Sequence, residues 1–207
     1  MQDKFSKRKN DILSKKDKSS IGDVDKKIVK LCEKINKTGD YYTTSSCAGR
    51  VILIIDSDEK KPDLFMKVWH DLITFNLLKK ELIEISKKTK ENIRFKQEPC
   101  ILHIACNNLE NAKKIYDKGK IAGWKKSGII SLGQRFIVEL NSTEKLEFPI
   151  ISNGKILVYP ENYKFSGPET LKNQKVPGDN FLKIIVKKSN ENLKKTWKKI
   201  EKLEKLI

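Results

Sequence analysis

The sequence has little of what marks the common metal-binding, disulfide-linked and membrane proteins. It contains four cysteines and two histidines among its 207 residues. No two cysteines are spaced as C-x-x-C, and no Cys/His group has the spacing of a zinc site. We therefore expect no metal, and thiols of this kind suit a reducing compartment. No apolar run approaches the roughly 20 residues of a membrane span, and the opening "MQDKFSKRKN" lacks the apolar stretch of a signal peptide. We expect a cytoplasmic protein without membrane contact.

The fingerprints of the common nucleotide-binding folds are missing as well. No G-x-G-x-x-G occurs, which argues against a Rossmann dinucleotide site. The segment "GIISLGQR" has the glycine spacing of a P-loop, but Gln134 and Arg135 replace the lysine and hydroxyl residue that would hold phosphate and metal. Cys47 and Arg50 are too close together for the phosphate loop of cysteine phosphatases.

Positive charge is what the sequence has in excess. Lysine and arginine number 44 against 27 aspartates and glutamates, a formal net charge of +17. A basic face concentrates phosphate and favours a polyanionic partner such as a nucleic acid. The alternative is a lysine-rich surface that reflects composition alone. A chain of this length is expected to form one domain, spanning 1–207.

Hydrophobic periodicity predicts interleaved helices and strands. The segment 22–42 contains a helix with Ile28, Leu31 and Ile35 on one face, and Cys32 is expected in the core. Further helices are expected over 62–88, 107–123 and 181–207. Strands are expected over 50–56, 92–99, 100–107, 127–133, 134–140, 146–150 and 154–159, and 161–177 reads as a loop rich in proline and glycine. The pattern predicts a mixed α/β (α+β) domain, compact and not of the Rossmann type.

The stretch "DYYTTSSCAGR" (40–50) is the most unusual part of the chain, because hydroxyl side chains run without a break from Tyr41 to Ser46. We expect a turn leading into the strand that follows. Hydroxyls and backbone amides at such a turn make a cradle for an anion or another polar ligand. Gly49 permits close backbone approach, and Arg50 can bind a carboxylate or phosphate with two hydrogen bonds. The alternative is an ordinary turn whose side chains bond to their own backbone.

Three further places carry candidate functional residues. His70, on the expected helix 62–88, and His103, inside a strand, are the side chains best able to titrate near neutrality, although a histidine in a strand is more often a satisfied core residue. In "GWKKSGI", Trp124 could stack on a base and Lys125 and Lys126 could meet phosphates. The alternative is a surface loop with a half-buried tryptophan.

Several of these motifs occur together in one family. The chain resembles the wybutosine-synthesis methyltransferases, the third enzyme of the eukaryotic pathway and its archaeal counterparts. The resemblance lies in "FSKRKNDIL", "GDVDKKI", "YYTTSSCAGR", the "WH" after Val68, "PCILHIAC", "GWKKSGIIS" and "RFIVELNSTEKLEFPI", which appear in the family's order over nearly the whole chain. The family hallmark is S-x-S-S-C-x-G-R. Here Thr43 replaces the first serine and keeps the hydroxyl.

The resemblance implies a fold outside the Rossmann methyltransferases, S-adenosylmethionine as methyl donor, and phenylalanine tRNA as partner. The acceptor would be a ring nitrogen of the tricyclic guanosine beside the anticodon. On this basis we expect one group of residues to hold the donor or a nearby phosphate: Ser45, Ser46, Cys47, Gly49, Arg50 and Asp40.

Catalytic roles, as base or in orienting the substrate, are expected of His70, His103 and Asp25. The substrate is expected to meet Trp124, Lys125, Lys126, Ser127 and Arg135. Two alternatives stay open: an RNA-binding protein without catalysis, and a hydrolase that uses Cys47 beside a histidine.

Overall fold

The computed structural model describes residues 4–15, 25–59, 62–133, 135–159 and 178–207. Its contacts gather in two compact units that alternate along the chain. Unit 1 contains residues 1–49, 99–144 and 194–207, and unit 2 contains residues 50–98 and 145–193. The expected loop 161–177 lies outside the described residues.

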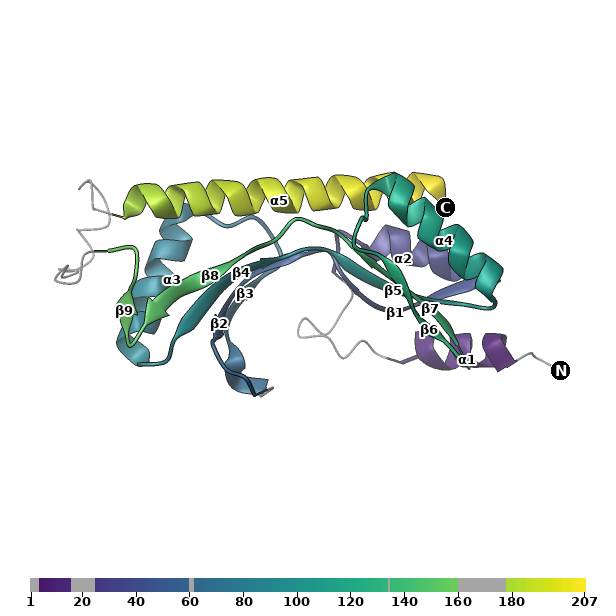
Figure 1. Cartoon of the computed structure of the whole chain (residues 1–207), viewed down its shortest axis with the longest axis horizontal. Helices are drawn as coiled ribbons and strands as arrows, with labels where there is room; N and C mark the ends of the chain where they lie inside the picture. Colours follow the sequence, from purple (N-terminus) through teal and green to yellow (C-terminus); the bar gives the residue numbers. More distant parts are fainter. Residues whose placement is uncertain (1–3, 16–24, 60–61, 134, 160–177) are drawn as a thin grey trace. The chain divides into compact units, whose positions relative to one another are not determined.

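Unit 1 is built on a four-stranded sheet (Figure 1). Its strands are β1 (Tyr41–Cys47), β5 (Ile101–Cys106), β7 (Phe136–Asn141) and β6 (Gly128–Leu132), in that order across the sheet. All neighbours run antiparallel. The last pair is the hairpin expected from the two successive strand signals.

Helices cover both faces of this sheet. Helices α2 (Val29–Lys37) and α4 (Leu109–Ala122) lie on one face, and α1 (Lys4–Leu13) lies on the other (Figure 1). The face with α2 and α4 carries the main core, to which α2 contributes Leu31, Cys32 and Ile35, as its helical spacing predicts. Helix α4 begins at the cap Asn108, whose side chain accepts the Asn111 N–H, and ends at the left-handed Gly123.

Unit 2 is built on a five-stranded antiparallel sheet of order β3-β2-β4-β8-β9. The strands are β2 (Arg50–Ile55), β3 (Phe65–Trp69), β4 (Ile93–Glu98), β8 (Leu146–Ser152) and β9 (Lys155–Ile156). Helix α3 (Phe75–Lys88) begins at Thr74, whose side chain accepts the Leu77 N–H. Its buried Leu78, Leu82 and Ile85 form the apolar face that packs into the unit.

The C-terminal helix α5 (Asp179–Leu206) contributes residues to each unit. Within unit 2 its first turn carries Asp179, which pairs with the buried Lys79 at 3.0 Å and accepts a hydrogen bond of 2.8 Å from the Tyr159 hydroxyl. Within unit 1 its residues Ile200 and Leu203 join the main core. The helical spacing of these apolar residues in the sequence is confirmed.

The structure corrects the helix expected over 62–88. Residues Pro62–Leu64 form a short 3-10 turn (η1), Phe65–Trp69 is strand β3 paired with β2, and only Phe75–Lys88 is helical. The segment Phe65–Trp69 is rich in aromatic and β-branched residues, which favour a strand beside β2 over a helix. His70 therefore follows a strand and does not lie on a helix.

The architecture confirms a mixed α/β fold that is not of the Rossmann type. Every strand pairing in the two sheets is antiparallel, whereas a Rossmann sheet is mostly parallel. In the described parts of the chain, no helix combines the length and apolar character needed to cross a bilayer.

Candidate functional site

The hydroxyl run is a strand and not the turn expected from the sequence. Residues Tyr41–Cys47 form β1, at the edge of the unit 1 sheet beside β5. Tyrosine and threonine favour strands, and the pairing with β5 outweighs the turn tendency of the serines. At Thr43 the Asn36 side chain accepts the backbone N–H at 2.8 Å and donates to the hydroxyl at 3.1 Å. The Asn36 side chain, from α2, thus satisfies the backbone N–H and the hydroxyl of Thr43 on this edge strand.

An irregularity at Thr44 decides which hydroxyls face outward. Thr43 pairs with Ile104 of β5 but Ser45 pairs with His103, so one extra residue is inserted between them. Side chains alternate between the faces of a strand, and such a bulge therefore reverses the alternation beyond it. Ser45 consequently shares a face with His103, and Ser46 stands opposite the buried Leu102.

Three side chains in a row across β1, β5 and β7 form a hydrogen-bonded relay. The Ser45 hydroxyl lies 2.8 Å from His103 Nδ1, and His103 Nε2 lies 2.8 Å from Glu139 Oε2. Their backbones are in register, because Ser45 pairs with His103 and His103 pairs with Glu139. The side chains of His103 and Glu139 are 26% and 30% exposed, and Ser45 is exposed.

This geometry fixes how the imidazole can act. A carboxylate only accepts hydrogen bonds, so Glu139 holds a proton on Nε2. In the neutral ring Nδ1 is then the acceptor and receives the Ser45 O–H. The serine oxygen is thereby prepared to take a proton from a ligand while passing its own to His103.

Glu139 is the functional residue that sequence reasoning missed. It lies in "FIVEL", where a single charged residue interrupts an apolar strand, and that interruption was the available signal. Its use becomes clear only from the register of β5 against β7. His103 was expected as a core or catalytic residue, and the structure places it on a partly exposed sheet face.

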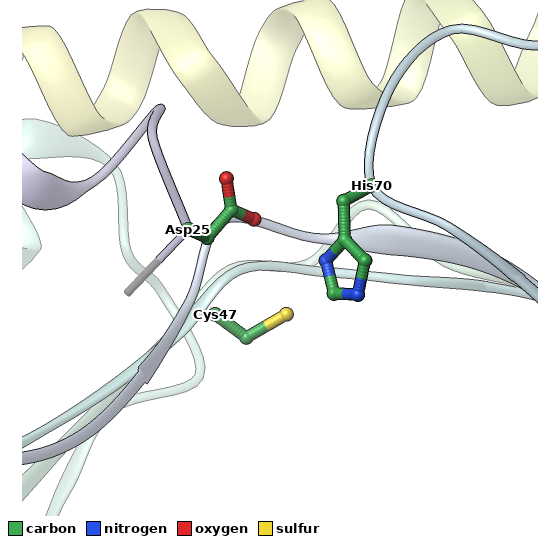
Figure 2. A group of neighbouring side chains, drawn as sticks. All are labelled: Asp25, Cys47 and His70. Atoms are coloured by element: carbon green, nitrogen blue, oxygen red, sulfur yellow. The ribbon is translucent and has the colours of Figure 1, made fainter. Parts of the chain in front are cut away.

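The end of β1 is anchored by Asp25. The buried Asp25 carboxylate, 7% exposed, accepts the backbone N–H groups of Lys27 and Ala48, each at 3.2 Å. One carboxylate oxygen also lies within 4.8 Å of the Cys47 sulfur. Figure 2 shows the Asp25 and Cys47 side chains beside each other. Asp25 thus ties the approach to α2 to the residue that follows β1.

Gly49 completes this anchored turn. Its φ is +93°, in the left-handed region that residues with a Cβ atom rarely adopt. A glycine here lets the chain leave β1 and enter β2 immediately afterwards, at Arg50.

Arg50 and His70 are the candidate residues of unit 2. Arg50 Nε donates to Glu98 at 2.6 Å, and the guanidinium carbon lies 5.2 Å from the centre of the Phe65 ring. Arg50 and Glu98 stand opposite each other in paired strands. The hydrogen bond to Glu98 holds one edge of the planar guanidinium, and the Phe65 ring lies against one of its faces. Together the two contacts fix the orientation of the terminal nitrogens.

Asp40 is not brought together with the rest of the hydroxyl motif. It precedes β1, accepts a hydrogen bond from the Asn107 side chain at 2.8 Å, and accepts the Asn107 N–H on its carbonyl. Cys47 ends the same strand, and at about 3.3 Å per residue the two lie roughly 20 Å apart along it. Asp40 therefore belongs to the opposite end of the sheet.

The segment 124–127 divides into buried and exposed parts. Trp124 is 0% exposed in the main core and donates its indole N–H to the Lys199 carbonyl at 3.2 Å, so its ring offers no face to a base. Ser127 donates to the Trp124 carbonyl and accepts the Asn141 N–H, which is a structural use of the hydroxyl. Lys125 and Lys126 are exposed, as phosphate contacts would require.

Burial separates the four thiols, none of which forms a disulfide. Burial, with a smaller effect from Asp40, raises the pKa of Cys106 to about 12. Burial also raises the pKa of Cys100 to about 12. Both stay protonated at neutral pH. Cys47 is the partly exposed thiol, and Cys32 is buried in the core as expected.

Comparison with known proteins gives a consistent result. The family described as "Methyltransferase TYW3" matches residues 7–207. A protein of Methanocaldococcus jannaschii named "tRNA(Phe) 7-((3-amino-3-carboxypropyl)-4-demethylwyosine(37)-N(4))-methyltransferase" is 35% identical over 84% of this chain and 81% of its own length. The human "tRNA wybutosine-synthesizing protein 3 homolog" is 34% identical over 78% of this chain and 63% of its own length.

A solved structure shows the same fold. The PH1069 protein from Pyrococcus horikoshii superposes with a TM-score of 0.74 at 27% identity, covering 97% of this chain and 92% of that protein.

Proposed function

The chain belongs to the family described as Methyltransferase TYW3, as its motifs predict, and we propose that it methylates a ring nitrogen of the tricyclic wyosine-type base beside the anticodon of phenylalanine tRNA. The archaeal relatives are named for transfer to N(4) of a demethylwyosine derivative at position 37 of this tRNA. We propose that both units act as one tRNA methyltransferase domain, residues 1–207, in the cytoplasm.

The observation that carries the proposal is the Ser45–His103–Glu139 relay on the motif strand. Methylation of a nitrogen that carries a hydrogen forms an N–C bond and must release a proton. Ser45 takes this proton as its own moves to His103 Nδ1, and Glu139 stabilises the imidazolium through Nε2. When bound, S-adenosylmethionine supplies a methyl group on a sulfonium, whose sulfur keeps the electrons of the broken C–S bond.

The residues around the motif suit the polar ends of this donor. Arg50 can bind a carboxylate through its terminal nitrogens, because Glu98 engages only Nε. The Asp25 carboxylate offers a negative charge for an ammonium or ribose hydroxyl, and the small side chain of Cys47 lies beside it. Ser46 adds a hydroxyl from the same strand as Cys47. These residues hold the donor, and His70 is the second candidate for orienting the substrate.

The charge of the chain suits the acceptor. The net charge of +17 gives tRNA a favourable long-range attraction. Lys125 and Lys126 are exposed and can meet phosphates. Binding of this kind weakens steeply with added salt, because counterions are released from the RNA.

The hydrolase alternative is not favoured. The matching family and the archaeal relatives are named for methyl transfer and not for hydrolysis. The alternative of an RNA-binding protein without catalysis would leave the relay without a use.

A methyl-transfer assay tests the proposal. The protein and S-adenosylmethionine are incubated with phenylalanine tRNA that carries the unmethylated tricyclic precursor, and with the same tRNA lacking it. Nucleoside mass spectrometry should show one added methyl group on the precursor tRNA alone. No gain on either, from protein that binds both tRNA and donor, would refute the proposed reaction.

A further inference from the structure

A cavity of about 730 Å³ lies within unit 1 where α1 meets the strand ends of the sheet. Helix α1 lies on the sheet face opposite α2 and α4 (Figure 1). Helix α1 forms one wall, and the ends of β1, β5 and β7 form the rest, so we call it the α1 cavity. Its volume is within the range of sites that take small organic ligands, about 300–1,000 Å³.

The rim of the α1 cavity is basic. Lys7 and Arg8 follow Lys4 by three and four residues, so the three lie on one face of α1, and Arg135 contributes from the residue before β7. Asp11 is the acidic residue among the lining side chains. Four cations against one carboxylate leave a local charge of +3. Within the described residues, no ion pair to a carboxylate involves these four cations, so their charge is available to a ligand.

The inner wall of the α1 cavity is apolar and aromatic. Tyr42, Ala105 and Cys106 are almost completely buried at its floor. The Phe5 ring packs on Tyr42 with ring centres 5.2 Å apart at 51°, and Phe136 forms another part of the lining. A site with aromatic rings below a basic rim is typical of proteins that bind single-stranded nucleic acid, where bases stack and phosphates meet the cations.

The charge argues against the methyl donor as the occupant. S-adenosylmethionine carries a sulfonium and an ammonium against one carboxylate, so its net charge is positive at neutral pH. A rim of charge +3 repels it and attracts a phosphodiester. A duplex is too wide to enter a cavity of this size, so the chemistry fits one unstacked nucleotide of a loop.

Resting on the proposed function, we infer that the α1 cavity binds a nucleotide from a single-stranded loop of the substrate tRNA. Lys7, Arg8 and Arg135 contact the backbone phosphates, and Phe5 stacks on the base. The cavity thus binds the RNA at a place distinct from the relay and fixes the substrate at a second point.

The test measures tRNA binding by three variants over a range of salt concentrations, from about 50 to 200 mM. The double variant Arg8→Ala/Arg135→Ala removes two rim charges. The control Lys113→Ala/Lys195→Ala removes two exposed lysines of unit 1 that do not line the cavity. Phe5→Leu removes the ring and leaves an apolar side chain. Circular dichroism checks that each variant is folded.

We expect the rim variant to lose at least tenfold in tRNA affinity and to lower the slope of log K against log salt by about 1–2, since each phosphate contact contributes about 0.7–0.9. Phe5→Leu should weaken binding about tenfold with an unchanged slope, because stacking does not depend on counterions. The control should resemble the wild type. Donor binding, measured by calorimetry, should stay unchanged in all three.

Two results would overturn the inference. A rim variant that matches the control in affinity and slope would show that the α1 cavity does not meet RNA. Binding of adenosine monophosphate is measured by calorimetry as well, and its loss in the rim variant with unchanged tRNA binding would assign the cavity to a free nucleotide. Because binding is read without turnover, a failure of the proposed methyl transfer in the wild type would leave this test intact.

Discussion

Replacement of Glu139 by glutamine tests the relay with the smallest change in shape. The glutamine amide can donate to His103 Nε2, which moves the ring proton to Nδ1, and Nδ1 then no longer accepts the Ser45 O–H. A hydrogen bond to a charged group contributes about 1.5–3 kcal/mol and a neutral one about 0.5–1.5 kcal/mol. The transition state should therefore lose about 1–2 kcal/mol.

A loss of this size corresponds to a methyl-transfer rate about 5–30 times lower, at roughly 1.4 kcal/mol per factor of ten. The assay is a single-turnover measurement with saturating donor and precursor tRNA, so that binding does not limit the rate. The control is Glu110→Gln, which removes an exposed carboxylate paired with Lys114 on α4 of the same unit. It should leave the rate unchanged.

The result that would refute the reasoning is a Glu139→Gln rate within about twofold of the wild type, below the smallest loss expected. A supporting measurement is the double variant His103→Ala/Glu139→Gln. If Glu139 acts only through His103, the double variant should be no slower than His103→Ala alone. Additive losses would show a separate role for the carboxylate.

Three further predictions concern the backbone, the pH and the thiols. Gly49→Ala should lower the free energy of unfolding by about 1–2 kcal/mol in urea denaturation because its φ is +93°, whereas Gly39→Ala, which meets no atom within 4 Å, should not destabilise the protein; equal effects would contradict the account. Hydrogen bonds from two lysines lower the pKa of Glu147 from 4.5 to about 2, so its stabilising contribution is complete above pH 4.5 and is lost as the pH falls toward 2. Glu147→Gln should therefore make the free energy of unfolding depend less steeply on pH in that window. An unchanged pH profile would rule this out. An alkylating reagent at neutral pH should modify Cys47 before Cys106, as read by peptide mass spectrometry, because Cys106 is buried with a pKa of about 12; the reverse order would contradict the burial.

Much of the fold follows from local sequence signals. The cap Asn108 and the terminal Gly123 delimit α4 within the range 107–123 expected from the sequence, and both residues act through the backbone of their own helix. The error over 62–88 arose because Leu64, Phe65 and Val68 recur at helical spacing, while pairing with β2 depends on residues distant in sequence. Periodicity alone cannot separate a short apolar strand from a helical turn.

The sequence predicted several residues of the candidate site but not how they are arranged. Ser45 and His103 were singled out as separate motifs, and their hydrogen bond depends on the register of β1 against β5. Glu139 depends on a second register, β5 against β7. Trp124 shows the opposite outcome, since a tryptophan between lysines and glycines resembles a stacking residue until its burial is known.

The bulge at Thr44 makes the pairing of the hydroxyl run with β5 more important than the exact composition of the run. Serine and threonine can replace each other along β1 with a hydroxyl retained at each place. If the same residues paired regularly with β5, without the bulge, Thr44 would instead stand opposite His103 and Ser45 would take a core-facing position. The position of Ser45 opposite the histidine therefore depends on the bulge. Transfer of the motif to another sheet would keep this position only if the bulge were transferred too.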